Sequence, residues 1–233
     1  MAASAPKPKA GEAVDAPVRR DPVQTQANIL KAATHEFAAY GFQGARTDRI
    51  ALDAGIGKRM IFHYFDSKEG LFAAVLEGVY ARIRTAEEGL DLTNRSPVEA
   101  IAALVGFSFD WYTRNPEFVP LLNEENLHQG RHLRGSHRAK DLTMPLVDKL
   151  QDILKRGEEE GVFRSGVDPV DLYISIAAIG YFYFSNTYTL GRIFDRDFAK
   201  EELIAKRRSH VIDMISSYLM FDPGPEGRTG GAP

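Results

Sequence analysis

The feature that most constrains the fold is the helical spacing of apolar residues, which recurs through almost the whole chain between residues 22 and 220. In the first such segment, residues 23–40, the side chains at one face recur three or four positions apart; they are Ile29, Ala32, Ala33, Phe37 and Tyr40. No segment sustains the two-residue alternation typical of a half-buried strand. The spacing therefore predicts an all-α protein without a β-sheet.

Caps and glycines divide this pattern into separate helices. Gly41 is the expected stop of the first helix, Gly55 the turn between two short ones, and Thr47 the expected cap of the second. Ser96 with Glu99 has the spacing of a capping box. The predicted helices cover residues 23–40, 48–54, 57–64, the segment after Ser67, 96–115, 117–127, 142–160, 168–189 and 198–220, and residues 128–140 are predicted to form a loop.

Composition excludes several classes of protein. The chain of 233 residues has no cysteine, so disulfide scaffolds, cysteine-ligated zinc sites and thiol nucleophiles are excluded. It lacks an apolar run of the roughly 18 residues that a membrane helix needs, and residues 1–18 lack the apolar centre of a secretory signal. We therefore expect a cytoplasmic protein. The net charge is −3, but residues 19–70 hold eight Lys or Arg against six Asp or Glu, a small local basic excess.

The segment of residues 47–65, TDRIALDAGIGKRMIFHYF, has the pattern of a helix-turn-helix, with two short helices on either side of a glycine turn. In such motifs the first turn of the second helix touches base edges in the major groove of DNA, and flanking polar groups contact phosphates. A helical hairpin with no role in DNA binding would give the same pattern of two short helices and a glycine turn. The candidate DNA-binding residues are Thr47, Lys58, Arg59, Met60, His63, Tyr64 and Lys68.

A longer set of residues resembles the DNA-binding domain of the tetracycline-repressor (TetR) family. It comprises Phe37–Phe42, Thr47, Ile50-Ala51, Ala54–Ile56, Phe62–Phe65 and Ser67–Leu71. The resemblance implies about nine helices, a homodimer and a C-terminal ligand-binding domain. Two positions depart from the family pattern: Gly57 stands where Ser is usual, and Phe62 stands where Tyr is usual. The loss of a capping oxygen and of a phenolic hydroxyl removes these two positions from the expected contacts.

The predicted helices and the family resemblance together divide the chain into four parts. Residues 1–21 and 222–233 are rich in proline or glycine and are expected to be a disordered arm and a flexible tail. Residues 22–70 are expected to form the DNA-binding domain, and residues 71–221 the helical ligand-binding and dimerisation domain. Arg19 and Arg20 of the arm could either reach the minor groove of DNA or stay disordered.

The C-terminal part is rich in aromatic residues, which favour either an ordinary core or a ligand pocket between helices. The candidate ligand-binding residues are Phe107, Trp111, Asn123, Glu124, Tyr183 and Asn186. The helices at 170–189 and 198–220 carry more apolar surface than one subunit should cover, so we expect them to form a dimer interface that includes Ile215.

No catalytic motif, metal site or cofactor is expected. The four-residue spacing of Glu124, His128 and His132 would suit a metal on a continuous helix, but Gly130 and the polar surroundings favour a loop. The expected function is that of a transcriptional regulator, in particular a repressor that binds a palindromic operator as a homodimer and is released by a small-molecule effector. The alternative is a helical small-molecule binder or enzyme that keeps the scaffold without binding an operator.

Overall fold

The computed structural model describes residues 21–134 and 136–220, and these residues form helices without any strand. The ten helices are α1 (Pro22–Gly44), α2 (Thr47–Asp53), α3 (Lys58–Phe65), α4 (Lys68–Glu88), α5 (Pro97–Arg114), α6 (Phe118–Leu127), α7 (His137–Glu159), α8 (Pro169–Ser185), α9 (Thr187–Phe194) and α10 (Glu201–Met220). The all-α prediction is confirmed. The predicted tail, and the predicted arm except for Asp21, lie outside the described residues, as do Arg19 and Arg20.

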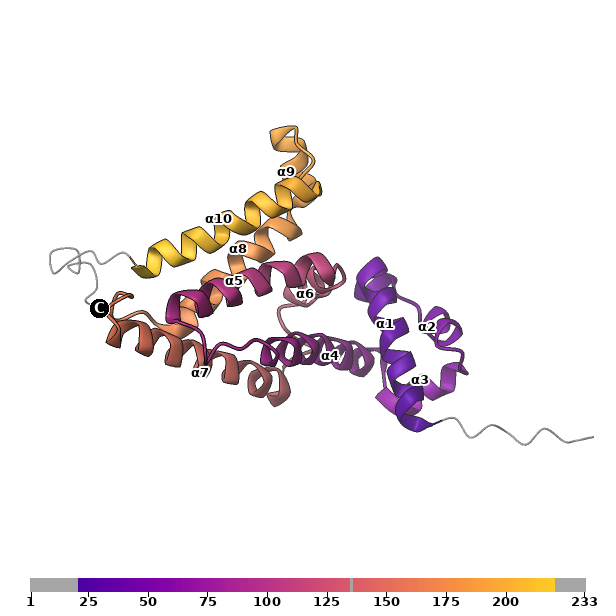
Figure 1. Cartoon of the computed structure of the whole chain (residues 1–233). Coiled ribbons are helices and arrows are strands. Elements are labelled where there is room, and N and C mark those ends of the chain that lie inside the picture. Colours follow the sequence, from indigo (N-terminus) through magenta and orange to yellow (C-terminus); the bar gives the residue numbers. More distant parts are fainter. Residues whose placement is uncertain (1–20, 135, 221–233) are drawn as a thin grey trace, which may run out of the picture.

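Helices α1, α2 and α3 form a small unit at one end of the molecule (Figure 1). Its centre holds large apolar side chains that are fully buried, among them Phe37, Ile50, Ile61 and Phe72. Gly55 makes the turn between α2 and α3 with a φ of +67°, a conformation that favours glycine. Helix α4 supplies Phe72 to this centre and then runs into the larger bundle, so it joins the two parts of the molecule (Figure 1).

The larger bundle is built around α5, which packs against α7, α8 and α10. Helices α5 and α8 of this bundle begin where the sequence predicts. Ser96 and Glu99 form the expected capping box at α5. The Asp168 carboxylate caps α8 and accepts hydrogen bonds from the Val170 and Asp171 amides at 2.8 and 2.9 Å. Because caps of this kind depend on neighbours in sequence, they were predictable without knowledge of the packing.

Several predicted boundaries differ from the structure. The first helix, predicted to stop at Gly41, continues to Gly44 across a kink at Gly41, and the last helix begins at Glu201 rather than at residue 198. The predicted helix 168–189 is broken at Asn186, whose backbone amide and side-chain amide both donate to the Phe182 carbonyl at the end of α8. The predicted loop 128–140 holds only as far as residue 136, because α7 starts at residue 137. Thr47 is the first residue of α2 rather than its cap, and Arg46 at the cap position makes no capping bond through its side chain.

Two side chains lie elsewhere than their spacing predicted. Tyr40 is 55% exposed, and its ring stacks under the Arg49 guanidinium at 4.2 Å instead of entering the core. Ile215 is only 4% exposed within a single chain and belongs to the core of the larger bundle. The prediction that Ile215 faces a second subunit is therefore wrong.

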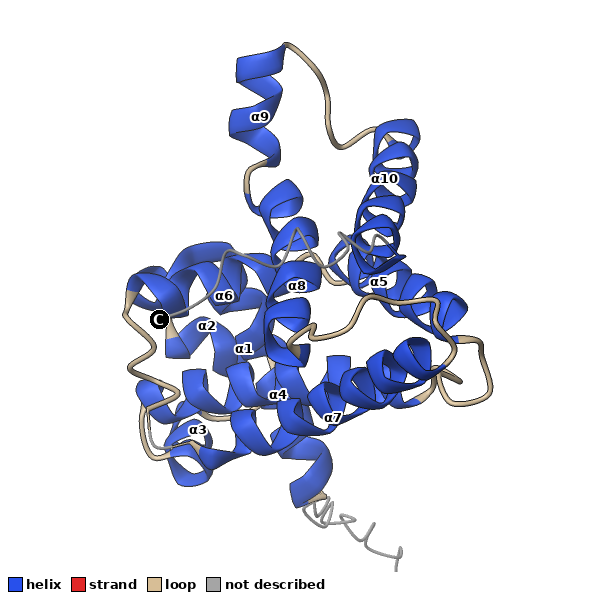
Figure 2. Ribbon diagram, turned by 90° about the vertical axis from the view of Figure 1, so that its left-hand side faces the viewer, coloured by secondary structure: helices blue, strands red, loops and turns tan. Residues whose placement is uncertain are grey.

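Helix α9 projects beyond the bundle and buries none of its side chains (Figures 1 and 2). Tyr188, Ile193 and Phe194 on this helix are 91%, 70% and 60% exposed. Exposed apolar residues also follow one face of α8 and of α10, namely Val170, Ile174, Phe182, Met214 and Tyr218. A large apolar area is thus left open on the side of the molecule formed by these three helices.

Candidate DNA-binding surface and effector cavity

The outward face of α3 carries most of the residues predicted to bind DNA. Lys58, Arg59 and His63 are exposed, and Met60 is 37% exposed, whereas Ile61 and Phe65 point into the core of the small unit. Within the described part of the chain, the side chains of Lys58 and Arg59 make no ion pair or hydrogen bond to protein. Two cations at the first turn of a short exposed helix can therefore donate to base edges or phosphates without breaking contacts in the fold.

The other predicted DNA-binding residues are more embedded. Tyr64 is half-buried, with its ring 5.3 Å from that of His63, and Thr47 is half-buried at the start of α2. The Lys68 ammonium donates to the Ala45 carbonyl at 2.6 Å and lies 5.0 Å from the centre of the Phe42 ring. Lys68 therefore ties the start of α4 to the loop before α2, and its contact with phosphate remains a prediction.

Sequence reasoning missed the group that fixes α2. The buried Glu36 carboxylate accepts from the Arg46 amide at 2.8 Å and from the Arg49 guanidinium at 2.7 Å. These bonds orient the start of α2 against α1. An acid at position 36, directly before the stretch FAAY, was the available signal, because a buried carboxylate needs partners.

The recognition helix begins without a side-chain cap. Gly57 occupies the cap position with φ −76° and ψ 140°, and it offers no oxygen to the first amides of α3. Gly57 stands where Ser is usual, and the expected loss of a capping oxygen at this position is therefore confirmed. Phe62, the second departure, is 40% exposed on α3 and has no hydroxyl to donate.

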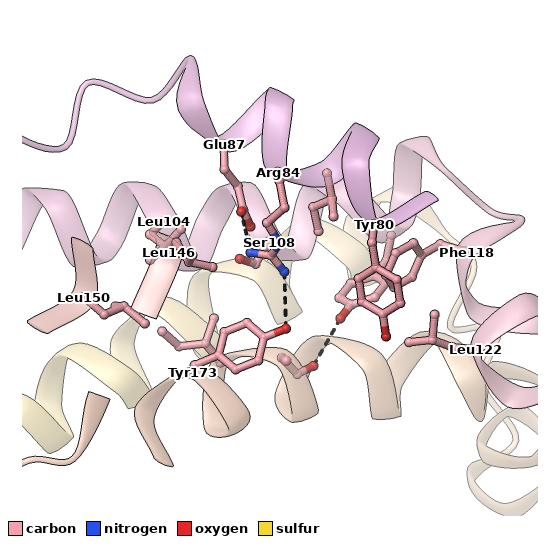
Figure 3. A pocket seen from close by; sticks show the side chains of 14 residues that line it. Tyr80, Arg84, Glu87, Leu104, Ser108, Phe118, Leu122, Leu146, Leu150 and Tyr173 are labelled. Carbon is pink, nitrogen blue, oxygen red and sulfur yellow. Dashed lines mark hydrogen bonds and ion pairs between the residues drawn. The ribbon is translucent and has the colours of Figure 1, made fainter. Parts of the chain in front are cut away.

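A cavity of about 70 Å³ lies in the larger bundle, between helices α4, α5, α6, α7 and α8 (Figure 3). Its lining is apolar and aromatic with a few polar groups, which is the usual character of ligand sites. The lining residues are Tyr80, Ile83, Arg84, Glu87, Leu104, Ser108, Tyr112, Phe118, Leu122, Leu146, Leu150, Tyr173, Ile176 and Ala177.

The centre of the lining is a buried ion pair. An Arg84 guanidinium nitrogen lies 2.5 Å from a Glu87 carboxylate oxygen, and the side chains are 9% and 5% exposed. A second guanidinium nitrogen donates to the Tyr173 hydroxyl at 3.2 Å. The Nε of Arg84 is buried and has no hydrogen-bond partner among the described residues. Figure 3 shows both bonds, with Ser108 beside the pair.

Burial changes the proton affinity of this lining. Loss of water raises the pKa of Glu87 to about 7, although the nearby Arg84 and Lys149 charges oppose the shift. Burial also raises the pKa values of the Tyr80 and Tyr112 hydroxyls, so both rings stay neutral. The charge in the cavity at neutral pH therefore depends on one carboxyl group.

None of the six residues predicted to bind ligand lines this cavity. The rings of Phe107 and Trp111 lie 6.0 Å apart in a tilted contact, and Tyr183 donates to the Phe198 carbonyl at 2.8 Å. Asn123 accepts from the Tyr181 hydroxyl, and Asn186 interrupts the helical pattern after α8 as described above. These four contacts involve different partners, and the cavity does not bring the side chains together.

Glu124 has a different role from the one expected. Its carboxylate accepts a hydrogen bond at 2.8 Å from the Phe42 amide, at the end of α1. Gly41, with φ +65°, lies against the same carboxylate, and a Cβ atom there would come within 3.0 Å of it. Glu124 thus connects α6, which lines the cavity, with the DNA-binding unit.

The spacing of Glu124, His128 and His132 does not produce a metal site. His132 Nδ1 bonds instead to Glu125 Oε2 at 2.6 Å, and Gln129 and Gly130 both have positive φ, which ends the helix between the histidines. Among the described residues no group of three His, Asp or Glu side chains is arranged to hold a metal ion.

The pattern of the sequence did not lead us to predict the α4 residues that line the cavity, although it contains a sign of their burial. Val79, Ile83 and Glu87 stand four residues apart on the stripe that faces the core. An acid that continues an apolar stripe is expected to be buried and to need a partner. Arg84, three residues before it, is placed to pair with it.

Both parts of the chain match known families of sequences. Residues 29–75 match the family described as bacterial regulatory proteins, tetR family, and residues 97–215 match the tetracyclin repressor-like C-terminal domain. Within the described residues, no helix has the length and apolar character needed to span a membrane.

Individual relatives agree with these matches. The chain is 40% identical over 191 residues to the HTH-type transcriptional repressor NicS of Pseudomonas putida. The aligned region covers 82% of this chain and 90% of NicS. It is 32% identical over 168 residues to the HTH-type transcriptional repressor SCO4008 of Streptomyces coelicolor, with coverage of 69% and 78%. The solved structure of SCO4942 from the same species superposes with a TM-score of 0.62 at 27% identity, covering 86% of this chain and 99% of that one. The chain therefore belongs to the tetR family of bacterial regulatory proteins and is a DNA-binding transcriptional regulator.

Proposed function

We propose that the chain is a repressor that binds a palindromic operator as a homodimer and leaves it when a small-molecule effector occupies the cavity. The observation that carries this proposal is the outward face of α3, where Lys58, Arg59, Met60 and His63 are open to solvent at one end of the molecule. The names of NicS and SCO4008 support repression as the direction of control. An operator as partner favours the bacterial cytoplasm as the place of action.

The dimer would form through the exposed apolar faces of α8 and α10. Val170, Ile174 and Phe182 recur at four- and eight-residue spacing on α8, and Met214 and Tyr218 recur on α10. A second copy that presented the same two helices would cover all five side chains in an isologous contact. Two α3 helices could then enter successive major grooves about 34–36 Å apart.

Two helices provide a route from the cavity to α3. Helix α4 contributes Tyr80, Arg84 and Glu87 to the cavity and packs its other end against α1. Helix α6 contributes Phe118 and Leu122 to the cavity and bonds to α1 through Glu124. A ligand that prefers a different position of these helices would change the spacing of the two α3 helices and weaken operator binding.

This arrangement also supports a functional division of the chain near residue 70, with DNA binding in residues 22–70 and effector binding and dimerisation in residues 71–221. Helix α4 crosses the boundary and belongs structurally to both parts.

Selection of bound sequences from random DNA would test the proposal. We expect a palindrome, with binding that weakens steeply as salt rises because phosphate contacts release counterions. Light scattering of the bound complex should give two chains for each palindrome. The alternative, a helical small-molecule binder or enzyme that keeps this scaffold, predicts no enriched sequence and no salt-dependent DNA binding.

A further inference from the structure

We propose that the effector is a small organic anion, a monocarboxylic acid with no more than about one ring. Its carboxylate binds by replacing Glu87 as the ion-pair partner of Arg84. This inference rests on the proposed function, because it names the chemical class of ligand for the cavity of that regulator. It follows from three features of the lining: an unused donor, the size of the space and the position of a second carboxyl group.

The unused donor belongs to Arg84. The guanidinium has five N–H donors, and two of its nitrogens are engaged, by Glu87 and by the Tyr173 hydroxyl. The Nε is buried and unpaired among the described residues, and the side chain is 9% exposed. Burying such a donor without a partner is costly. A carboxylate that reached Nε and a neighbouring nitrogen together would form the paired bonds that a planar guanidinium makes best.

The size of the cavity limits the rest of the ligand. Its volume of about 70 Å³ is roughly half that of an engineered apolar cavity that holds benzene. Glu87 itself lines the cavity, so movement of its carboxylate away from Arg84 would enlarge the space. The remaining walls are aliphatic and aromatic, with Leu104, Leu146 and Leu150 on one side and Tyr80 and Phe118 on the other in Figure 3.

The second carboxyl group makes the exchange depend on protons. Two carboxylates cannot both remain charged against one guanidinium in a buried site. The charged and titratable groups around Glu87 come from several helices: Arg84 and Tyr80 from α4, Tyr112 from α5, Lys149 from α7 and Tyr173 from α8.

Of these groups, Arg84 and Lys149 are the cations that favour a charged Glu87, and burial already raises the pKa of Glu87 to about 7 in their presence. Loss of Arg84 to the ligand raises that pKa further. Glu87 then takes a proton from water, and one buried ion pair replaces another.

The consequence is a ligand whose affinity depends on pH. Where Glu87 is charged in the free protein, binding takes up one proton. The affinity for the anion should therefore rise by at most about tenfold for each unit that the pH falls toward about 7, the pKa of Glu87 in the free protein. A neutral analogue should show no such dependence.

Calorimetry on the full chain can test the proposal with benzoate and its neutral analogue benzamide as probes. We expect benzoate to bind at least about tenfold more tightly than benzamide at neutral pH, because only benzoate forms charge-assisted bonds to Arg84. Titrations in buffers of different ionisation enthalpy should show uptake of up to one proton.

Four variants make the test specific. Glu87→Gln should bind benzoate more tightly than the wild type at high pH and lose the pH dependence. Arg84→Gln should lose the preference for benzoate, and Arg84→Lys should retain part of it. Glu88→Gln changes the exposed neighbouring acid on α4 and should behave like the wild type. Circular dichroism would establish that each variant is folded.

Equal binding of the two probes, or binding of neither, would overturn the ligand class. A pH dependence that persists in folded Glu87→Gln would overturn the exchange. Operator binding measured without any probe keeps the two proposals apart. A protein that binds its palindrome but does not prefer benzoate refutes only this inference, and one that prefers benzoate but binds no palindrome refutes the proposed function.

Discussion

At the scale of single residues, the first turn of α3 holds two cations that the fold does not use. Arg59 is exposed and unpaired within the described residues, and it lies one position after Lys58 at the start of the helix. Its guanidinium can bond in a bidentate manner to a guanine edge, which contributes about 1–3 kcal/mol of discrimination between bases.

We therefore expect Arg59→Ala to relax the sequence preference at one base pair in each half-site, while binding to random DNA weakens much less. Competition binding with operators mutated at each position would measure this. Arg192→Ala, at an exposed position of α9, is the matched control. An equal loss on specific and random DNA would mean that Arg59 contacts only phosphate.

Glu87 gives a prediction about stability that needs no ligand. Its pKa in the folded protein is raised from 4.5 to about 7, mainly by burial. The folded state therefore binds this proton more tightly than the unfolded chain does. The stabilisation is complete below the unfolded value, and it is lost as the pH rises from about 4.5 to about 7; the loss is about 3 kcal/mol at most.

Glu87→Gln should flatten this part of the curve of unfolding free energy against pH. Urea denaturation at several pH values would measure it, with Glu88→Gln, an exposed acid, as the control. The idea fails if wild type and Glu87→Gln have parallel curves between these pH values.

At the scale of helices, the contact between α6 and α1 is the most specific link from the cavity to the DNA-binding unit. It depends on the Glu124 carboxylate and the Phe42 amide, with Gly41 at φ +65° placed against the same group. Removal of the acceptor leaves a partly buried amide unpaired, which costs about 1–3 kcal/mol.

We expect Glu124→Ala to lower the melting temperature and to reduce the effect of effector on operator affinity. Glu124→Gln keeps an acceptor oxygen and should preserve most of both properties. Thermal melts and DNA-binding titrations with and without effector would measure them. Full effector response in Glu124→Ala would assign the coupling to α4 alone.

At the scale of the whole molecule, the open apolar faces of α8 and α10 favour a second copy of the chain as their cover. Ile174 is 54% exposed on α8, whereas Ile215 on α10 is 4% exposed and internal. A buried aspartate without a partner is costly, so the same substitution should have different effects at these two positions.

Ile174→Asp should give folded monomers that bind the palindrome much more weakly, whereas Ile215→Asp should unfold the chain. Leu127→Asp, at a 77% exposed position on α6, is the control and should remain a dimer. Light scattering and circular dichroism would separate these outcomes. A dimeric Ile174→Asp protein with normal operator binding would place the interface elsewhere.

The sequence by itself determined the features that depend on near neighbours. The helices follow from apolar spacing, their ends follow from Ser96, Asp168 and Gly55, and the exposed cations of α3 follow from their place at a helix start. These properties involve residues a few positions apart, so the pattern carries them without reference to the rest of the fold.

Only the tertiary structure decided which side chains meet across helices. Apolar spacing marks a buried face but does not say what covers it, so Ile215 could have faced either a second copy or its own core. In the same way, the cavity is lined by Arg84 and Glu87 among other residues, but not by the predicted Phe107, Trp111 and Tyr183. Tyr173, which bonds to Arg84, and Phe42, which bonds to Glu124, lie on helices distant in sequence, and only the packing of those helices brings them within hydrogen-bonding distance.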